Sequence, residues 1–96
     1  PSQIEHVLLG IPEVGNQFMV YVDRVNHLDE MTIDVEINRD FFSGELKDLA
    51  RIQNKVVKAL RDALELRTTV RLVEPGSLPR FEGKAKRVVD RRKDTL

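Results

Sequence analysis

The chain has 96 residues, which suffice for one domain at most. It contains no cysteine, which excludes disulfides and thiolate metal sites, and its two histidines, His6 and His27, are too isolated to make a metal site by themselves. No apolar run approaches the length of a membrane span and no signal peptide is visible, so we expect a soluble cytoplasmic domain with no membrane partner. Because the chain starts at Pro1 rather than at Met, we expect a piece of a larger protein.

Formal charges cancel over the whole chain but not within its halves. Residues 1–50 carry ten acidic and three basic side chains, whereas residues 51–96 carry six acidic and thirteen basic ones. The basic half predicts an anionic partner, which can be a phosphorylated ligand, a nucleic acid or the acidic surface of another domain. The asymmetry does not choose among these partners.

The first predicted element is a short helix that begins at Ser2. Ser2 and Glu5 form a capping box. Apolar residues then recur at helical spacing, namely Ile4, Val7, Leu8 and Ile11. Gly10 and Pro12 predict the end of the helix, and His6 falls on its opposite, solvent-facing side.

Two strands with alternating apolar side chains are predicted next, over residues 18–22 and 31–37. The segment 23–29 between them is polar and turn-like, and Asn26 suits the left-handed conformation. The two strands predict a hairpin with one wet face. Asp34 and Glu36 fall on that face, and we interpret them as solvated surface residues rather than metal ligands.

The strongest helical pattern in the chain follows over about five turns. Its apolar positions are Leu46, Leu49, Ile52, Val56, Leu60 and either Ala63 or Leu64. Ser43 is predicted to cap this helix. The opposite face carries Lys47, Arg51, Lys55, Lys58 and Arg61. This basic stripe is either a phosphate-binding surface or the ordinary wet face of an amphipathic helix, and acidic neighbours at helical distances favour the second interpretation.

Residues 68–73 predict a third short strand, which the Pro75-Gly76 turn ends. Residues 86–92 are predicted to form a terminal helix or a surface tail. The order of elements predicts an α+β fold with a small antiparallel three-stranded sheet, two packed helices (αββαβ) and a basic C-terminal loop and tail. A further strand before Pro1 would complete a ferredoxin-like βαββαβ pattern.

The run from Val73 to Arg87 combines a rigid turn, a glycine beside a lysine and a dense cluster of cations. Its proline and glycine residues break any regular element. Gly83 frees the backbone just before Lys84, so one ammonium group can be presented at a fixed position on a loop. The alternative interpretation is an ordinary solvated loop.

Several short segments together match a known pattern. They are Pro1-Ser2-Gln3-Ile4-Glu5, Leu28-Asp29-Glu30, Val35-Glu36, Val73-Glu74-Pro75-Gly76-Ser77-Leu78-Pro79-Arg80 and Gly83-Lys84-Ala85-Lys86-Arg87. With these segments the chain resembles the C-terminal domain of phenylacetate–coenzyme A ligases, which belong to the adenylate-forming, AMP-binding enzyme superfamily. The resemblance covers essentially the whole chain and is most specific over residues 73–87.

This resemblance implies a two-step reaction. A carboxylic acid such as phenylacetate attacks the α-phosphate of ATP, and coenzyme A then displaces AMP from the acyl adenylate. A large N-terminal domain, the partner of this one, is expected to hold the acid, the nucleotide and Mg²⁺. Residues 1–96 correspond to the mobile C-terminal domain, which swings between the two half-reactions. The family's hinge acid and glycine-rich tunnel strand precede Pro1, so the chain alone is expected to be inactive and to bind no cofactor.

The resemblance also implies roles for individual cations. Lys84 follows Gly83 as the family's adenylation lysine follows its glycine, and a compact ammonium between two anions lowers the barrier electrostatically. The wider superfamily pattern, Pro-Arg-Thr, one residue, Ser-Gly-Lys, is one residue longer, so Lys86 is the alternative. Arg80 and Arg87 are expected to touch phosphate or to stabilise the loop.

Arg91 and Arg92 are candidates for the 3′-phosphate end of coenzyme A, and a solvated tail is the alternative. Two other functions compete with the ligase interpretation. One is a ferredoxin-like module that senses a small molecule. The other is an RNA-binding module, which the sequence disfavours because Phe18 and Tyr21 fall on opposite faces of their strand. No pattern indicates an oligomeric state.

Overall fold

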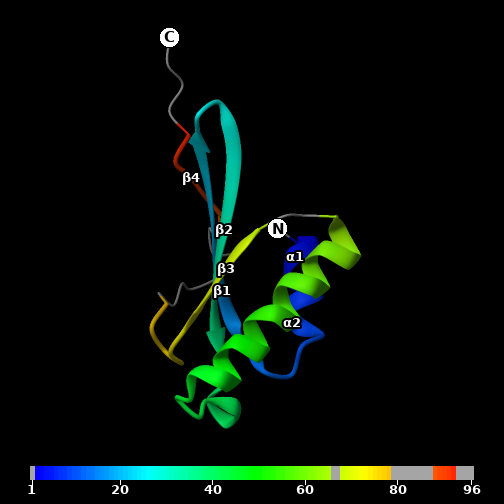
Figure 1. The fold of residues 1–96 in the computed structure, drawn as a ribbon, viewed down its shortest axis with the longest axis vertical. Helices are drawn as coiled ribbons and strands as arrows, with labels where there is room; N and C mark the ends of the chain where they lie inside the picture. Colours follow the sequence, from blue (N-terminus) through cyan, green and yellow to red (C-terminus); the bar gives the residue numbers. More distant parts are fainter. Residues whose placement is uncertain (1, 66–67, 79–87, 93–96) are drawn as a thin grey trace.

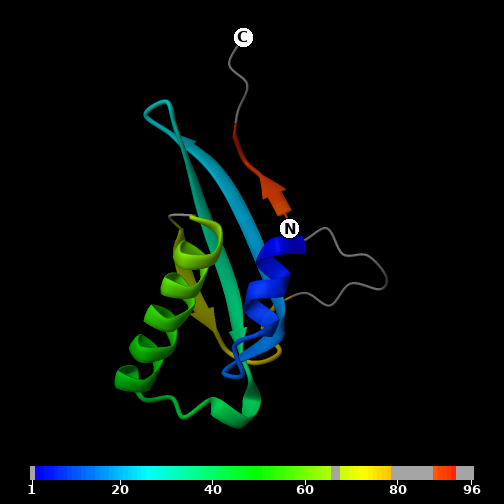
Figure 2. The same ribbon diagram turned by 90° about the vertical axis from the view of Figure 1, so that its right-hand side faces the viewer.

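A computed structural model of the chain describes residues 2–65, 68–78 and 88–92. Its elements in chain order are α1 (Ser2–Leu9), β1 (Val14–Val25), β2 (Leu28–Ile37), the 3₁₀ helix η1 (Arg39–Phe41), α2 (Leu46–Leu64), β3 (Thr69–Val73) and β4 (Val88–Asp90). Helices α1 and α2 lie on one side of a four-stranded sheet, and the tip of the β1–β2 hairpin projects beyond them (Figures 1 and 2). The predicted α+β class with two packed helices is confirmed.

The β1–β2 hairpin is longer than the two predicted strands. Its antiparallel pairing continues to Val25 and Leu28, so only Asn26 and His27 form the turn. Both have positive φ, 51° and 68°, as a type I′ turn requires. The left-handed Asn26 is therefore confirmed, whereas the long polar turn over residues 23–29 is wrong. The tip is exposed, and polar residues interrupt the apolar alternation there, so no pattern reveals these ends of the strands.

Both helices follow their apolar patterns, but the predicted cap of α2 is wrong. Glu45 occupies the N-cap position and its side chain makes no capping bond. The Ser43 hydroxyl instead accepts a hydrogen bond from the Glu45 N–H at 3.2 Å and donates one to Asp48 Oδ2 at 2.9 Å. Ser43 thus orders the approach to the helix, because its hydroxyl bonds the nearby backbone before the first turn begins.

The strand order is β3-β2-β1-β4, and the sheet is mixed. Strands β2 and β3 are parallel neighbours joined by α2, as a βαβ crossover requires. The third strand is therefore confirmed, but it is not antiparallel, and the βαβ unit is not split by another strand as in a ferredoxin-like sheet.

Strand β4 corrects the prediction of a terminal helix or tail over residues 86–92. Val88, Val89 and Asp90 pair in parallel with residues 20–22 of β1. Two adjacent valines suit a strand but are too few to create a local periodic pattern. Their partner strand lies more than sixty positions earlier in the sequence, so only the tertiary structure reveals the pairing.

The hydrophobic core fills the space between the sheet and the helices. Its most deeply buried members are Val20, Ile33, Val35, Ile52, Val56, Leu60 and Val70. Ile4 and Leu8 of α1 join the same cluster. The apolar alternation of residues 31–37 is thereby confirmed, and the stripe of α2 is confirmed from Ile52 to Leu64, whereas Leu46 at its start is exposed. Each such side chain contributes about 1.5–3 kcal/mol when fully buried.

The opposite face of the sheet, which we call the open face, is less wet than predicted. Asp34 and Glu36 are only 7% and 4% exposed, so their assignment to a solvated surface is wrong. Arg71, which is in register with Asp34 on β3, donates two hydrogen bonds to its carboxylate, at 2.6 and 2.8 Å. Charge-assisted bonds of this kind offset the cost of burying a carboxylate. The segment that follows β3 covers Glu36.

Candidate functional site

The chain turns sharply just after β3. The Ser77 N–H donates to the Glu74 carbonyl at 3.1 Å, which closes a four-residue turn with Pro75 and Gly76 at its centre. Gly76 has a φ of 83°, which a type II turn requires at its third position and which other residues adopt only with strain. The sequence signal for a rigid Pro-Gly turn is confirmed.

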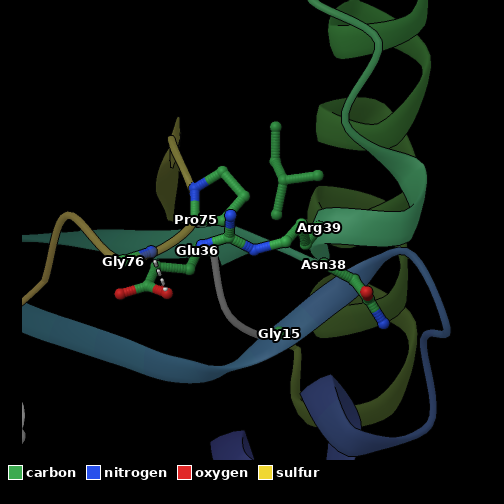
Figure 3. A pocket seen from close by; sticks show the side chains of 7 residues that line it. Gly15, Glu36, Asn38, Arg39, Pro75 and Gly76 are labelled. Carbon is green, nitrogen blue, oxygen red and sulfur yellow. Dashed lines mark hydrogen bonds between the residues drawn. The ribbon is translucent and has the colours of Figure 1, made fainter.

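The carboxylate of Glu36 holds this turn against the sheet. Its Oε1 accepts a hydrogen bond from the Gly76 N–H at 2.9 Å (Figure 3), and its Oε2 accepts one from the Leu78 N–H at 3.0 Å. Leu78 itself is buried, 9% exposed. The point at which the chain enters residues 79–87 is therefore tied to β2 by a buried charge.

A pocket of about 240 Å³ lies beside the turn. It is lined by Gly15, Glu36, Ile37, Asn38, Arg39, Pro75 and Gly76. The exposed Arg39 side chain extends toward the turn, and a Cβ atom added at Gly76 would meet Arg39 Nη2 at 4.0 Å (Figure 3). Arg39 thus places a cation close to the beginning of the segment that contains the candidate lysines.

Arg91 fastens the other end of that segment to β1. Its Nε and Nη2 donate to the two carboxylate oxygens of Asp23 at 2.8 and 2.6 Å. Its guanidinium carbon lies 4.5 Å from the ring centre of Tyr21, within the range of a cation–π contact. The Arg91 N–H also donates to the Val22 carbonyl at 2.7 Å, which continues the β1–β4 ladder.

Arg92 is paired with two carboxylates. It donates to Asp90 from Nε at 2.9 Å and from Nη2 at 2.7 Å, and its Nη1 reaches Asp29 Oδ2 at 2.9 Å. The Arg92 hydrogen bonds hold the pKa of Asp90 at about 2, below its usual value of 3.8. Hydrogen bonds from Arg24 and Arg92 likewise lower the pKa of Asp29. The end of the described chain is therefore ion-paired to the hairpin.

The structure separates the predicted site residues into two groups. Lys84, Lys86, Arg80 and Arg87 lie outside the described residues. Arg91 and Arg92 are described, and both carry ion pairs to the β1–β2 hairpin in place of the solvated tail that was their alternative. The prediction that they contact coenzyme A is untested.

Two residues that hold the loop were not recognised in the sequence. Glu36 follows the alternation of a wet strand face, and Asp23 lies in what was predicted as a polar turn. Their partners are 40 and 68 positions away, so no local pattern reveals them. For Glu36 the sequence offered one signal, the match of Val35-Glu36 to the family pattern, and that match assigned no role to Glu36.

Basic side chains of the second half form ion pairs with acidic side chains of the first half. Cations of the second half bind carboxylates of the first in the pairs Lys55–Glu13, Arg51–Glu13, Arg71–Asp34, Arg91–Asp23 and Arg92–Asp29. Glu13 is 6% exposed, and the hydrogen bond from Lys55 is the largest cause that lowers its pKa. Part of the basic excess is therefore neutralised within the chain, including two members of the basic stripe on α2.

Across residues 2–65, 68–78 and 88–92, no group of three or more His, Cys, Asp or Glu side chains could hold a metal ion. Within the same ranges, no helix combines the length and apolar character needed to cross a bilayer.

Comparison with known proteins extends over nearly the whole chain. A phenylacetate-coenzyme A ligase of Thermus thermophilus is 35% identical over 97% of this chain, which spans 24% of that enzyme. The chain thus covers about a quarter of the length of such relatives.

Solved structures also match over nearly the whole chain. A crystal structure of a domain of phenylacetate-coenzyme A ligase from Bacteroides vulgatus has a TM-score of 0.86 and 32% identity, with 99% of this chain and 86% of that one covered. 2-Hydroxyisobutyryl-CoA ligase, with 2-HIB-AMP and CoA in the thioesterification state, has a TM-score of 0.89 and 27% identity over 97% of this chain and 19% of its own. The same ligase in the postadenylation state with 2-HIB-AMP has a TM-score of 0.83, with 27% identity over 94% of this chain and 19% of that one.

The family described as AMP-binding enzyme C-terminal domain matches residues 1–92, which include both helices, all four strands and the run with the candidate lysines. The chain belongs to this family.

Proposed function

We propose that this chain is the mobile C-terminal domain of an acid–coenzyme A ligase of the phenylacetate type. The observation that carries the proposal is the match of both sequence and fold to such ligases along almost the entire chain. The rest of the ligase, which holds the acid and nucleotide pockets and Mg²⁺, is then the large partner of this domain. We expect the enzyme in the cytoplasm, in phenylacetate catabolism, where ATP and coenzyme A are its other substrates.

The proposed reaction has two half-reactions. A carboxylate oxygen of the acid first forms a bond to the α-phosphorus of ATP, and the bond to the β-phosphate oxygen breaks to release pyrophosphate. The coenzyme A thiol, after loss of its proton, then forms a bond to the acyl carbon, and AMP leaves with the bonding electron pair. A new set of groups must face the acyl adenylate in the second step.

We assign the first step to Lys84, with Lys86 as the alternative. Carboxylate and triphosphate are both anions, so a cation between them stabilises the transition state only if it is held in the right position. The described anchors at Leu78 and Arg91 support such placement, because they tie the chain to the sheet on both sides of residues 79–87. Arg80 and Arg87 are proposed phosphate contacts within the same segment.

We further propose that the domain swings as one body between the half-reactions. The related 2-hydroxyisobutyryl-CoA ligase has been crystallised in postadenylation and thioesterification states, and this chain matches its fold in both. A rigid domain that rotates can present residues 79–87 for adenylation and withdraw them afterwards. Arg91 and Arg92 are bound to Asp23 and Asp29 of the hairpin. A contact with coenzyme A would either add to these ion pairs or replace them.

The RNA-binding alternative gains no support from the described surface. Phe18 is 4% exposed under the helices, and the Arg91 guanidinium lies over the Tyr21 ring. The sheet therefore offers no free pair of aromatic rings for base stacking among the described strands. No observation favours a small-molecule-sensing module either.

The test uses the full-length ligase with Lys84→Ala and Lys86→Ala made separately, because the two lysines are matched controls for each other. Adenylation is measured as ATP–pyrophosphate exchange with phenylacetate and related aryl acids, and thioester formation is measured from pre-made acyl adenylate. We expect Lys84→Ala to lower exchange by about 100-fold or more and to spare the second step. Loss confined to Lys86→Ala would move the role by two residues, and full activity of both variants would refute the assignment.

A further inference from the structure

Residues 79–87 connect opposite edges of the sheet. In sequence they join Leu78, which follows β3, to Val88, the first residue of β4. The strand order places β3 and β4 on the two outer edges, with β2 and β1 between them. The segment that contains the candidate lysines is therefore delimited by two fixed points. Both points are held by the β1–β2 hairpin, although neither belongs to it in sequence.

The Glu36 carboxylate on β2 holds the first fixed point. Each of its oxygens accepts one backbone N–H, from Gly76 and from Leu78. Because the carboxylate is buried, loss of its charge leaves two amides of the turn with weaker partners in a site that water reaches poorly. Glu36 therefore sets where and at what angle the chain leaves the sheet.

The Asp23 carboxylate on β1 holds the second fixed point. It holds Arg91 through two parallel hydrogen bonds, and the guanidinium rests on Tyr21. Strand β4 has three residues, and Val88 is 37% exposed, so apolar burial contributes little to its attachment. The Asp23–Arg91 pair therefore adds to the backbone pairing of β4 with β1 in fixing the far end of the segment.

We propose that Glu36 and Asp23 are positioning residues for adenylation. Each holds one end of residues 79–87, and together they make the β1–β2 hairpin the base on which the adenylation lysine is placed. The inference rests on the proposed function. It goes further in assigning a role to two carboxylates that do not touch substrate and that act through the backbone and through Arg91.

The experiment compares Glu36→Gln and Asp23→Asn in the full-length ligase, each with Lys84 intact and in the Lys84→Ala background. We expect each single substitution to lower ATP–pyrophosphate exchange by about 10- to 100-fold, the scale of a misplaced catalytic group, and to leave thioester formation from acyl adenylate within about twofold. In the Lys84→Ala background neither should lower exchange further, since there is no ammonium left to misplace.

Glu30→Gln is the matched control, because Glu30 is an exposed carboxylate of the same hairpin. Arg91→Lys adds a test of geometry: it keeps the charge but loses the bidentate fork, so it should retain only part of the exchange activity that Arg91→Ala loses. If Glu36→Gln does not fold, Asp23→Asn still tests the second fixed point at the surface.

Three results would overturn the inference. Equal losses in both half-reactions would indicate general damage to the domain. Further losses of exchange in the Lys84→Ala background would show that the carboxylates act independently of the lysine. Normal exchange in Glu36→Gln and Asp23→Asn, beside a large loss in Lys84→Ala, would remove the positioning role alone, whereas normal exchange in both Lys84→Ala and Lys86→Ala would remove the lysine assignment of the proposed function together with the positioning role.

Discussion

The two faces of the sheet are built by different kinds of interaction. The helix-covered face is packed with aliphatic side chains, and residues such as Ile33 and Val35 are completely buried there. The open face is covered by ion pairs and by backbone amides that bind carboxylates of the hairpin. The first face holds the domain together, and the second arranges the C-terminal third of the chain around it.

The largest effect is expected on the helix-covered face. Leu60→Ala removes a completely buried side chain from α2 and leaves a cavity, so we expect the free energy of unfolding to fall by about 2–5 kcal/mol. Denaturant unfolding of the 96-residue chain measures it. Leu46→Ala is the control, because Leu46 is 83% exposed on the same helix and its loss should cost little. Equal costs for the two variants would contradict the position of the core.

A smaller effect is expected on the open face. Asp34→Asn removes the charge that receives the two Arg71 bonds, so we expect a loss of about 1–3 kcal/mol by the same measurement. The cost is smaller than for Leu60 because Arg71 is half exposed and can turn to water. Glu30→Gln, at an exposed position of the same strand, serves as the control. No loss in Asp34→Asn would mean that this ion pair is only a surface contact.

The hairpin turn should tolerate, and gain from, one substitution. His27 has a φ of 68°, which is strained for a residue with a Cβ atom, and glycine is preferred at this position of a type I′ turn. We expect His27→Gly to raise the midpoint of thermal unfolding, with a gain of about 0.5–1 kcal/mol. A lower midpoint would indicate that the turn has another geometry.

The smallest effect concerns the edge of the sheet at β4. Arg92 lowers the pKa of Asp90 to about 2 from 3.8, so the contribution of this pair is complete above the unfolded value and is lost only as the pH falls through the folded one. We expect the carboxyl ¹³C resonance of Asp90 to titrate with a midpoint near 2 in the folded chain. In Arg92→Ala the midpoint should return toward 3.8, and an unchanged midpoint would show that the pair is not formed in solution.

What the sequence predicts follows the same division between faces. The apolar repeat from Leu46 to Leu64 and the alternation around Ile33 and Val35 are local patterns, and each predicted an element that the structure contains. Asp34, Glu36 and Asp23 also occupy polar positions of local patterns. Their partners come from β3, from the turn that follows β3 and from the far side of residues 79–87, respectively. Burial of a carboxylate depends on such distant partners, so a single strand cannot disclose it.

The candidate site shows a related limit. The Pro75-Gly76 turn was predictable, because its geometry is set by a few consecutive residues, including a glycine that can adopt the positive φ of Gly76. Strand β4 was not, because its partner strand β1 lies more than sixty positions earlier and two adjacent valines make no local periodic pattern. The role of Lys84 comes from resemblance alone, since a glycine beside a lysine is equally compatible with a solvated loop.

The measurement that tests this account most directly is ATP–pyrophosphate exchange by the full-length Lys84→Ala ligase, with thioester formation from acyl adenylate measured beside it. The account predicts that exchange falls by about 100-fold or more while thioester formation stays within a few-fold of the unmodified enzyme. Exchange at the unmodified rate, with Lys84 absent, would contradict it.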